Sequence, residues 1–361
     1  MKKKIVIDCS SINNKKNGIN RYTIEIVNRL KYKKNLEIYL VTSSSLYSIS
    51  KKNFKQVTEF KIKFLKILFF QIHIFFYLLK LQPNIYWSPN HRLPLCLFFF
   101  QNIKKVVTIH DLCYLKFPNK MKILTRFLDI IFINFAILIA DKLITVSNSV
   151  KLEIINKFKI PKHKILKIYS GSFLKDKIFK HKNKNKIKYL LFVGTIEPRK
   201  NIKNLILGFD LFYRNNLNSN IHLYIAGGKG WDNQNYSLLL DSLESKNYIK
   251  IIINPSDNNL KKMYQDCLAH INASFYEGFG LPIVEAMSYK KMSILSNIPI
   301  YKEITENKFV YFDPKDIEDI SKKINFFIKK KIYKKKINFN FRKKYSWTNS
   351  ALDLNNLFLS L

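Results

Sequence analysis

Cysteine is scarce in this sequence. The chain contains four, and no two of them stand at the spacing of a Cys-x-x-Cys pair. They are Cys9, Cys96, Cys113 and Cys267. Scattered single cysteines argue against a zinc site and provide no disulfide framework. This usage fits a protein of a reducing compartment.

Acidic residues are also few relative to basic ones. Against 63 Lys and Arg there are 25 Asp and Glu, a formal net charge of +38. Such an excess of positive charge can bind an anionic membrane surface or nucleic acid. Alternatively, the basic side chains are solvated and their number reflects a coding bias toward Lys, Ile and Asn. No zinc-finger spacing, RNP-like aromatic motif or basic region with heptads occurs. We therefore expect no nucleic-acid partner, a mostly solvated excess, and some lysines that add affinity for anionic lipid.

No stretch matches a membrane-spanning helix, which needs about 20 mostly apolar residues. The most apolar segment, residues 64–81, is interrupted by Lys66, Gln71, His73 and Lys80. It predicts a core or interfacial helix. The N-terminus is basic with only a short apolar run, which predicts a strand and not a signal peptide. These features favour a cytoplasmic protein with peripheral contact to the inner face of the membrane.

Signatures of metal or nucleophilic catalysis are missing too. No Asp-x-Asp pair follows a predicted strand, no histidine cluster occurs, and no Ser-His-Asp or Cys-His set has a recognisable spacing. We therefore expect no catalytic metal and no cofactor.

What the sequence does contain is a regular alternation of apolar runs and helical segments. At 361 residues, two domains are expected. Predicted strands span residues 3–8, 36–42, 84–88, 105–110, 142–147, 164–168, 189–195, 221–226, 249–253, 269–273, 293–296 and 310–312. Predicted helices include residues 21–30, 64–81, 121–140, 150–158, 202–213 and 259–266. Strands that alternate with helices predict an α/β fold with parallel sheets and helices on both faces.

A Lys- and Asn-rich stretch without apolar periodicity, residues 169–188, predicts a linker. It separates two Rossmann-like domains, residues 1–168 and 189–345, which we expect to face each other across a cleft. The last helix, residues 346–361, is expected to cross back onto the N-terminal domain.

The stretch 274–287, SFYEGFGLPIVEAM, carries most of the chemistry. It holds Glu277 and Glu285 eight positions apart, with a Gly-Phe-Gly turn between them. Pro282 is expected at the first helical position, because its missing N–H would be unpaired there anyway. The free N–H groups of a helix start suit phosphates, and carboxylates accept hydrogen bonds from sugar hydroxyls. The alternative is an ordinary loop and amphipathic helix with two surface glutamates.

Other reactive residues follow predicted strand ends. In the second half these are Gly194, Thr195, Arg199, Lys200, Gly227, Gly228 and Lys229. In the first half, His110 ends a strand and Gly18 lies in the loop after the first strand. Since parallel strands bring their C-terminal ends to one edge, the second-half set predicts a site for a nucleoside diphosphate sugar. Arg199 and Lys200 could instead be solvated charges, His110 a structural cap and Gly18 a simple turn.

These motifs resemble the retaining glycosyltransferases of group 1 (family 4), which have the GT-B fold. The segments FVGTIEPRKNIKNLILGF, IAGGKGW and YEGFGLPIVEAMS carry the resemblance, and GINRYT and TIHDL match in the first half. The Glu277-x7-Glu285 pattern is that family's signature. At Thr195 many members have Arg, but the sequence is similar to a Gly-Thr branch followed by Glu-Pro-Arg-Lys, and it resembles the mannosyltransferase-like members.

The resemblance implies a role for each site residue. Glu285 would hold the ribose hydroxyls, and Glu277 would hold hydroxyls of the donor sugar. Arg199 and Lys200 would neutralise the diphosphate, and His110 would sit by the donor sugar at the reacting face. The other implied donor-binding residues are Gly18, Gly194, Thr195, Gly227, Gly278, Phe279, Gly280 and Leu281.

The resemblance therefore implies a retaining hexosyltransferase that works without metal. The hexose would move from a nucleotide sugar to a glycan or lipid-linked acceptor in cell-surface polysaccharide synthesis. The Glu-Pro-Arg-Lys-Asn and Gly-Gly-Lys-Gly-Trp segments favour GDP-mannose or a related GDP-sugar as the donor. Alternatives of other classes are a catalytically silent sugar-nucleotide-binding subunit and a basic nucleic-acid-binding scaffold.

Overall fold

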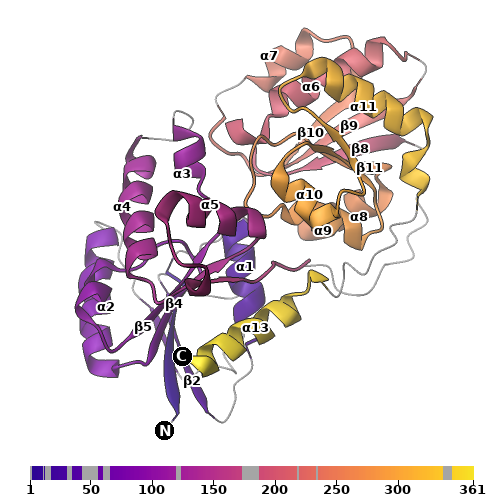
Figure 1. Ribbon diagram of the computed structural model, residues 1–361. Helices are drawn as coiled ribbons and strands as arrows, with labels where there is room; N and C mark the ends of the chain where they lie inside the picture. The colour runs from indigo at the N-terminus through magenta and orange to yellow at the C-terminus, as the bar shows by residue number, and fades with distance from the viewer. Residues whose placement is uncertain are drawn as a thin grey trace. The chain divides into compact units, whose positions relative to one another are not determined.

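The computed structural model describes residues 2–10, 12, 18–30, 35–42, 56–59, 66–118, 123–172, 187–217, 219–232, 235–335 and 344–361. They form two compact units (Figure 1). Unit 1 comprises Met1–Gly171 and Lys344–Leu361, and unit 2 comprises Ser172–Lys343. Each unit is a parallel sheet with helices packed against it, so the predicted α/β fold of two Rossmann-like domains is confirmed.

Over the described residues, the sheet of unit 1 has seven strands in the order β3-β2-β1-β4-β5-β6-β7, all parallel. They are β1 (Lys3–Asp8), β2 (Leu36–Thr42), β3 (Gln56–Glu59), β4 (Ile85–Ser88), β5 (Lys104–Ile109), β6 (Lys142–Thr145) and β7 (Ile165–Lys167). In the register, Ile5 of β1 lies between Ile38 of β2 and Ile85 of β4, and all three are fully buried. A strand covered on both faces needs such a continuous apolar run. The short strand β3 was not predicted.

Helical elements connect the strands of unit 1. They are α1 (Gly18–Val27), α2 (Lys66–Leu81), η2 (Leu95–Phe99), α3 (Cys113–Lys116), α4 (Ile123–Ile139), α5 (Asn148–Phe158) and η4 (Lys162–Lys164). Residues of α2, η2, α3, α4 and α5 share one hydrophobic core with the sheet. The side chain of Ser147 caps α5, because its Oγ accepts a hydrogen bond from Val150 N at 3.1 Å. Gly18 opens α1, so the prediction that it lies in the preceding loop was wrong. Within the described residues, no helix has the length and apolar character to cross a membrane.

The C-terminal helix α13 (Trp347–Ser360) packs on unit 1, as expected. The Lys3 Nζ donates to the carbonyl oxygen of Leu359 at 2.8 Å. The ring of Phe358 lies 5.7 Å from that of Trp87. Packing is so close that a Cβ atom on Gly171 would stand 2.3 Å from Trp347 N. The last helix is therefore a structural part of the N-terminal domain.

The sheet of unit 2 has six parallel strands in its described part, in the order β10-β9-β8-β11-β12-β13. They are β8 (Lys188–Val193), β9 (Ile221–Gly227), β10 (Ile249–Ile253), β11 (Ala269–Asn272), β12 (Ser293–Ser296) and β13 (Val310–Phe312). The helical elements are η5 (Pro198–Lys200), α6 (Ile202–Arg214), α7 (Tyr236–Asp241), η6 (Lys246–Tyr248), α8 (Asp257–Asp266), α9 (Leu281–Ser288), α10 (Pro299–Thr305), α11 (Ile317–Lys329) and η7 (Ile332–Lys334). Figure 1 shows α6 and α11 side by side, and the two are in contact.

Strand order reverses between β8 and β11 in unit 2, as it does between β1 and β4 in unit 1. Open α/β sheets bind ligands outside the carboxyl ends of strands at such a switch point. In unit 2 the segments that leave β8 and β11 carry Arg199, Lys200 and Glu277. The topology thus brings together residues that are 77 positions apart.

Candidate functional site

The site of unit 2 begins where β8 and β9 end. A Cβ atom on Gly227 would stand 1.7 Å from the carbonyl oxygen of Gly194, so only glycine allows these strand ends to approach so closely. Beyond them, Ile196 N donates to the carbonyl oxygen of Gly228 at 2.9 Å. These contacts fix the start of the segment that carries Thr195 and the basic pair.

The turn η5 is tied to the end of β11. Asn201 adopts a left-handed conformation with a φ of 57° and ends the turn. Its side-chain amide donates to the carbonyl oxygens of Ala273 at 3.1 Å and Pro314 at 2.6 Å. In return, the carbonyl oxygen of Arg199 accepts from Phe275 N at 2.9 Å. The segments that follow β8 and β11 are therefore held as one structure.

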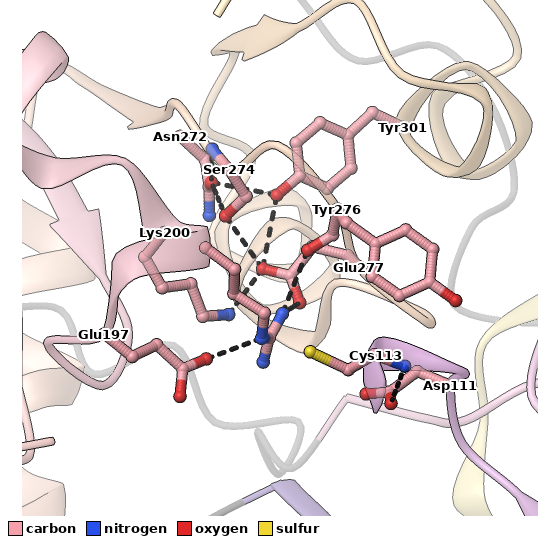
Figure 2. Close-up of polar contacts among 10 residues, drawn as sticks. Asp111, Cys113, Glu197, Lys200, Asn272, Ser274, Tyr276, Glu277 and Tyr301 are labelled. Atoms are coloured by element: carbon pink, nitrogen blue, oxygen red, sulfur yellow. Dashed lines mark hydrogen bonds and ion pairs between the residues drawn. The ribbon is translucent and has the colours of Figure 1, made fainter. Parts of the chain in front are cut away.

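Glu277 lies at the centre of the resulting polar cluster (Figure 2). Its side chain is buried, with 7% of the residue exposed. One oxygen, Oε1, pairs with Lys200 Nζ and accepts from Ser274 Oγ at 2.9 Å. The other, Oε2, accepts from Arg199 Nη1 at 2.7 Å. Arg199 Nε also lies 2.6 Å from Glu197 Oε1, so two cations and two carboxylates balance in this cluster.

The pKa of Glu277 follows from this pairing. Burial alone would raise it, but the charges of Lys200 and Arg199 and their hydrogen bonds outweigh burial and lower the pKa to about 2. Glu277 is therefore ionised at neutral pH. An ionised carboxylate only accepts hydrogen bonds, which is the chemistry that binds hydroxyl groups.

Neutral side chains support the cluster from the inside of the sheet. Asn272, the last residue of β11, accepts on Oδ1 from Ser274 Oγ at 2.7 Å and from Tyr301 Oη at 2.8 Å. All three residues are fully buried, and Figure 2 shows them on the same side of Glu277. Buried and hydrogen-bonded groups of this kind fix the position of the carboxylate.

The helix α9 starts directly after the cluster. Gly280 precedes it with a φ of 97°, a conformation that side-chain-bearing residues rarely adopt. Leu281 is the first helical residue, and Pro282 is the second, one position later than predicted. The proline still lies among the helix-start N–H groups that have no intrahelical partner, so the reason for its placement holds.

Glu285 lies one turn into α9 and is held in a different way from Glu277. It is almost fully buried, with 2% exposed, and its Oε2 accepts from Tyr264 Oη at 2.7 Å. Tyr264 comes from α8, and its ring stacks on Tyr289 with centroids 5.7 Å apart. A phenol therefore sets the position of this carboxylate.

His110 belongs to unit 1 and follows β5 directly. Its Nε2 lies 2.8 Å from the carbonyl oxygen of Pro89. Burial lowers the pKa of His110 to about 4, so the ring is neutral at pH 7. A carbonyl oxygen only accepts, so Nε2 carries the proton and Nδ1 keeps an acceptor lone pair.

The structure brings together part of the predicted site. Arg199, Lys200 and Glu277 form one ionic cluster at the β8–β11 switch point. The other predicted residues of unit 2 lie at the ends of β8 and β9 or around the start of α9: Gly194, Thr195, Gly227, Gly278, Phe279, Gly280, Leu281 and Glu285. Gly18 and His110 lie in unit 1.

Four buried residues that hold the site were missed. They are Glu197, Asn272, Tyr264 and Tyr301. Glu197 precedes the basic pair and Asn272 lies near the end of a predicted strand, so their positions could have marked them. The two tyrosines lie on helices whose rotation the sequence does not define.

No group of three or more His, Cys, Asp or Glu side chains suited to a metal ion occurs among the residues that the structure describes. The expectation that the site works without metal or cofactor stays a prediction.

Two family models match the chain. The model described as glycosyltransferase family 4 matches residues 16–172, and that described as glycosyl transferases group 1 matches residues 173–344. The boundary between the matches, at residues 172 and 173, lies one residue from the boundary of the two units at Gly171 and Ser172. With this fold and these matches, the chain belongs to the group 1 glycosyltransferases of the GT-B fold.

Curated relatives are similar over part of the chain. O-antigen chain mannosyltransferase B of Escherichia coli is 32% identical over 133 residues, which are 37% of this chain and 35% of the relative. O-antigen chain mannosyltransferase RfbU of Salmonella typhimurium is 28% identical over 214 residues, 59% of this chain and 57% of the relative. The chain thus spans between about a third and three fifths of the length of these relatives.

Solved structures share the fold over the whole chain. Anabaena Alr3699/HepE, in complex with UDP and glucose, superposes with a TM-score of 0.76 at 15% identity, over 99% of this chain and 100% of the other. The lipopolysaccharide outer core galactosyltransferase WaaB superposes with a TM-score of 0.67 at 17% identity, over 99% and 100%. At these identities the likeness establishes the fold.

Proposed function

We propose that this chain is a retaining hexosyltransferase of cell-surface polysaccharide synthesis. It transfers a hexose, with mannose favoured, from a nucleotide sugar to a glycan or lipid-linked acceptor. The Glu277 cluster is the observation that carries the proposal. A buried, ionised carboxylate beside two cations at a strand switch point suits a ligand with both hydroxyl and diphosphate groups. The similarity to two O-antigen chain mannosyltransferases, at 32% and 28% identity, supports the choice of mannose and of polysaccharide synthesis.

In this proposal the two carboxylates divide the donor between them. Glu285, held by Tyr264, accepts hydrogen bonds from the ribose hydroxyls. Glu277 accepts hydrogen bonds from hydroxyls of the hexose. The backbone N–H groups of Phe279, Gly280 and Leu281 contact the sugar and diphosphate at the start of α9, where the helix dipole favours negative charge.

Arg199 and Lys200 supply positive charge to the departing diphosphate. Ion pairs with Glu277 and Glu197 fix the position of these cations. Charges that are in place before reaction need no reorganisation as charge develops on the leaving group. As the acceptor oxygen bonds to the anomeric carbon, the bond from that carbon to the phosphate oxygen breaks, and the departing phosphate takes the acceptor's proton on the same face.

Unit 1 is the acceptor side in this proposal. The neutral His110 presents an acceptor nitrogen at the reacting face, and Gly18 at the start of α1 contacts the donor phosphates. The reaction uses no metal and no cofactor. The protein works in the cytoplasm, and the helix α2 touches the inner, anionic face of the membrane.

The donor is tested by thermal unfolding with GDP-, UDP- and ADP-sugars. A ligand that binds only the folded state raises the unfolding temperature, and at 100 times its dissociation constant it adds about 2.7 kcal/mol. We expect the largest rise with GDP-mannose, followed by release of GDP when an acceptor is added. A rise in unfolding temperature without release of nucleoside diphosphate with any acceptor would identify a catalytically silent binding subunit. No rise with any nucleotide sugar, together with steeply salt-dependent RNA or DNA binding, would contradict the proposal.

A further inference from the structure

The helix α4 of unit 1 has an inverted distribution of polar and apolar residues. Among its described side chains, the exposed ones are all apolar: Ile123, Leu124, Phe127, Ile131 and Leu138. Two of its polar residues bind partners inside the unit. Asp129, with 6% exposed, accepts from Arg92 Nη2 at 2.5 Å, and Asn134 Oδ1 accepts from Tyr114 Oη at 2.6 Å. A helix that faces water presents the opposite pattern.

Two neighbouring elements extend this apolar surface. The turn η2 contacts both α4 and α2, and Leu95 N donates to Gln71 Oε1 of α2 at 2.8 Å. Phe98 and Phe99 of η2 are 63% and 75% exposed. On α2 the exposed apolar side chains are Phe69, Ile72, Phe76 and Leu79. Figure 1 shows α2 and α4 on the same side of unit 1. We call the exposed apolar residues of α2, η2 and α4 the apolar face.

Positive charge predominates in this chain, whose formal net charge is +38. The stretch 60–139, which contains α2, η2 and α4, has eleven basic residues and two acidic residues, Asp111 and Asp129. Asp129 is paired with Arg92 inside the unit. A second copy of the chain on this face would oppose like charges. An anionic lipid surface offers both apolar depth and opposite charge.

We propose that the apolar face inserts into the interface of an anionic lipid bilayer, with Phe98 and Phe99 as its deepest side chains. The inference widens the contact proposed above for α2 to three elements of unit 1. The inference rests on the proposed function in one respect: membrane binding would hold the enzyme where a lipid-linked acceptor lies. Binding to lipid requires neither donor nor transfer, so the two proposals fail separately.

The test is co-sedimentation of the full chain with vesicles of phosphatidylcholine containing phosphatidylglycerol, and with pure phosphatidylcholine vesicles. The variant Phe98→Ser/Phe99→Ser removes apolar surface and keeps every charge. The matched control, Leu238→Ser/Phe326→Ser, changes two exposed apolar residues of unit 2 that are 67% and 48% exposed. Exposed positions carry little of the folding energy, so both variants are expected to fold, and thermal unfolding checks this.

We expect the native chain and the control to bind the anionic vesicles equally, and the Phe98/Phe99 variant to lose at least about tenfold in partition coefficient. If that variant binds as tightly as the native chain, diffuse positive charge alone explains binding and the proposal is wrong. Absence of vesicle binding by the native chain also overturns it. So does a dimer of the native chain that the Phe98/Phe99 variant converts to monomer without any change in vesicle binding.

Discussion

Two carboxylates of the same sequence motif sit in unlike surroundings. Glu277 lies in the loop before α9, between two cations, and its pKa is lowered to about 2. Glu285 lies within α9, almost fully buried, and its Oε2 accepts a hydrogen bond from the neutral phenol of Tyr264. They are eight positions apart in the chain.

The difference separates two tasks. A carboxylate between fixed cations holds them in position, so Glu277 organises charge as well as binding hydroxyls. Glu285 is positioned by a neutral phenol, and an ionised carboxylate accepts hydrogen bonds from neutral hydroxyls such as those of ribose. We therefore assign the charge-sensitive step to Glu277 and the donor anchor to Glu285.

Removal of the Glu277 carboxylate should have the largest effect. Glu277→Ala leaves Lys200 and Arg199 buried without their shared counter-charge, which costs about 3 kcal/mol of folding stability. Because the same change disorders the charge that meets the leaving group, we expect transfer to fall by at least about a hundredfold. Urea unfolding and nucleoside diphosphate release measure the two effects. Glu318→Gln, at an exposed glutamate, is the control, and activity near the native level in Glu277→Ala would refute the assignment.

Acid should erase the stability advantage of Glu277. Its pKa in the folded chain, about 2, lies below the ordinary value of 4.5, so its contribution is full above pH 4.5 and is lost as the pH falls toward 2. The difference in unfolding free energy between the native chain and Glu277→Gln should therefore narrow between pH 5 and pH 3.5. The buried His110 and His270 have lowered pKa values and destabilise both proteins alike in acid, so their effect cancels in this difference. A difference that stays constant over this range would show that Glu277 is not held by charge.

Loss of the Tyr264 hydroxyl should have a smaller effect, confined to the donor anchor. Tyr264→Phe keeps the ring and removes the hydrogen bond to Glu285, and a bond to a charged group contributes roughly 1.5–3 kcal/mol. We expect donor affinity to fall about tenfold with little change in the rate at saturating donor. Tyr289→Phe, in the ring stacked on Tyr264, is the matched control. Isothermal titration with the donor separates the variants, and equal affinities in both would remove Tyr264 from the anchor.

The sequence predicted the strands and the charged part of the site well, for physical reasons. Residues 3–8, 36–42 and 249–253 are apolar runs bounded by polar segments, and the structure has strands with these bounds. Parallel strands gather their carboxyl ends, so the meeting of Arg199 and Lys200 with Glu277 followed from order alone.

Other features depend on tertiary packing and were not predictable. The rotation of α8 about its axis places Tyr264 beside Glu285, and the rotation of α10 places Tyr301 beside Glu277. The spacing of apolar residues does not define these rotations precisely enough to predict which side chain faces the site. Helix starts shifted for the same reason: α1 begins at Gly18, and Pro282 is the second residue of α9. The apolar face was predicted only for its α2 part, because α4 resembles a buried helix in sequence.

The most direct test of the division between the carboxylates compares two ligands on two variants. Titration of Glu285→Gln and Glu277→Gln with the nucleoside diphosphate and with the complete nucleotide sugar gives four dissociation constants. We expect Glu285→Gln to weaken both ligands by the same factor. We expect Glu277→Gln to leave the nucleoside diphosphate nearly unchanged and to remove the added affinity that the hexose provides. Equal losses for both ligands in both variants, or the reverse pattern, would contradict the account.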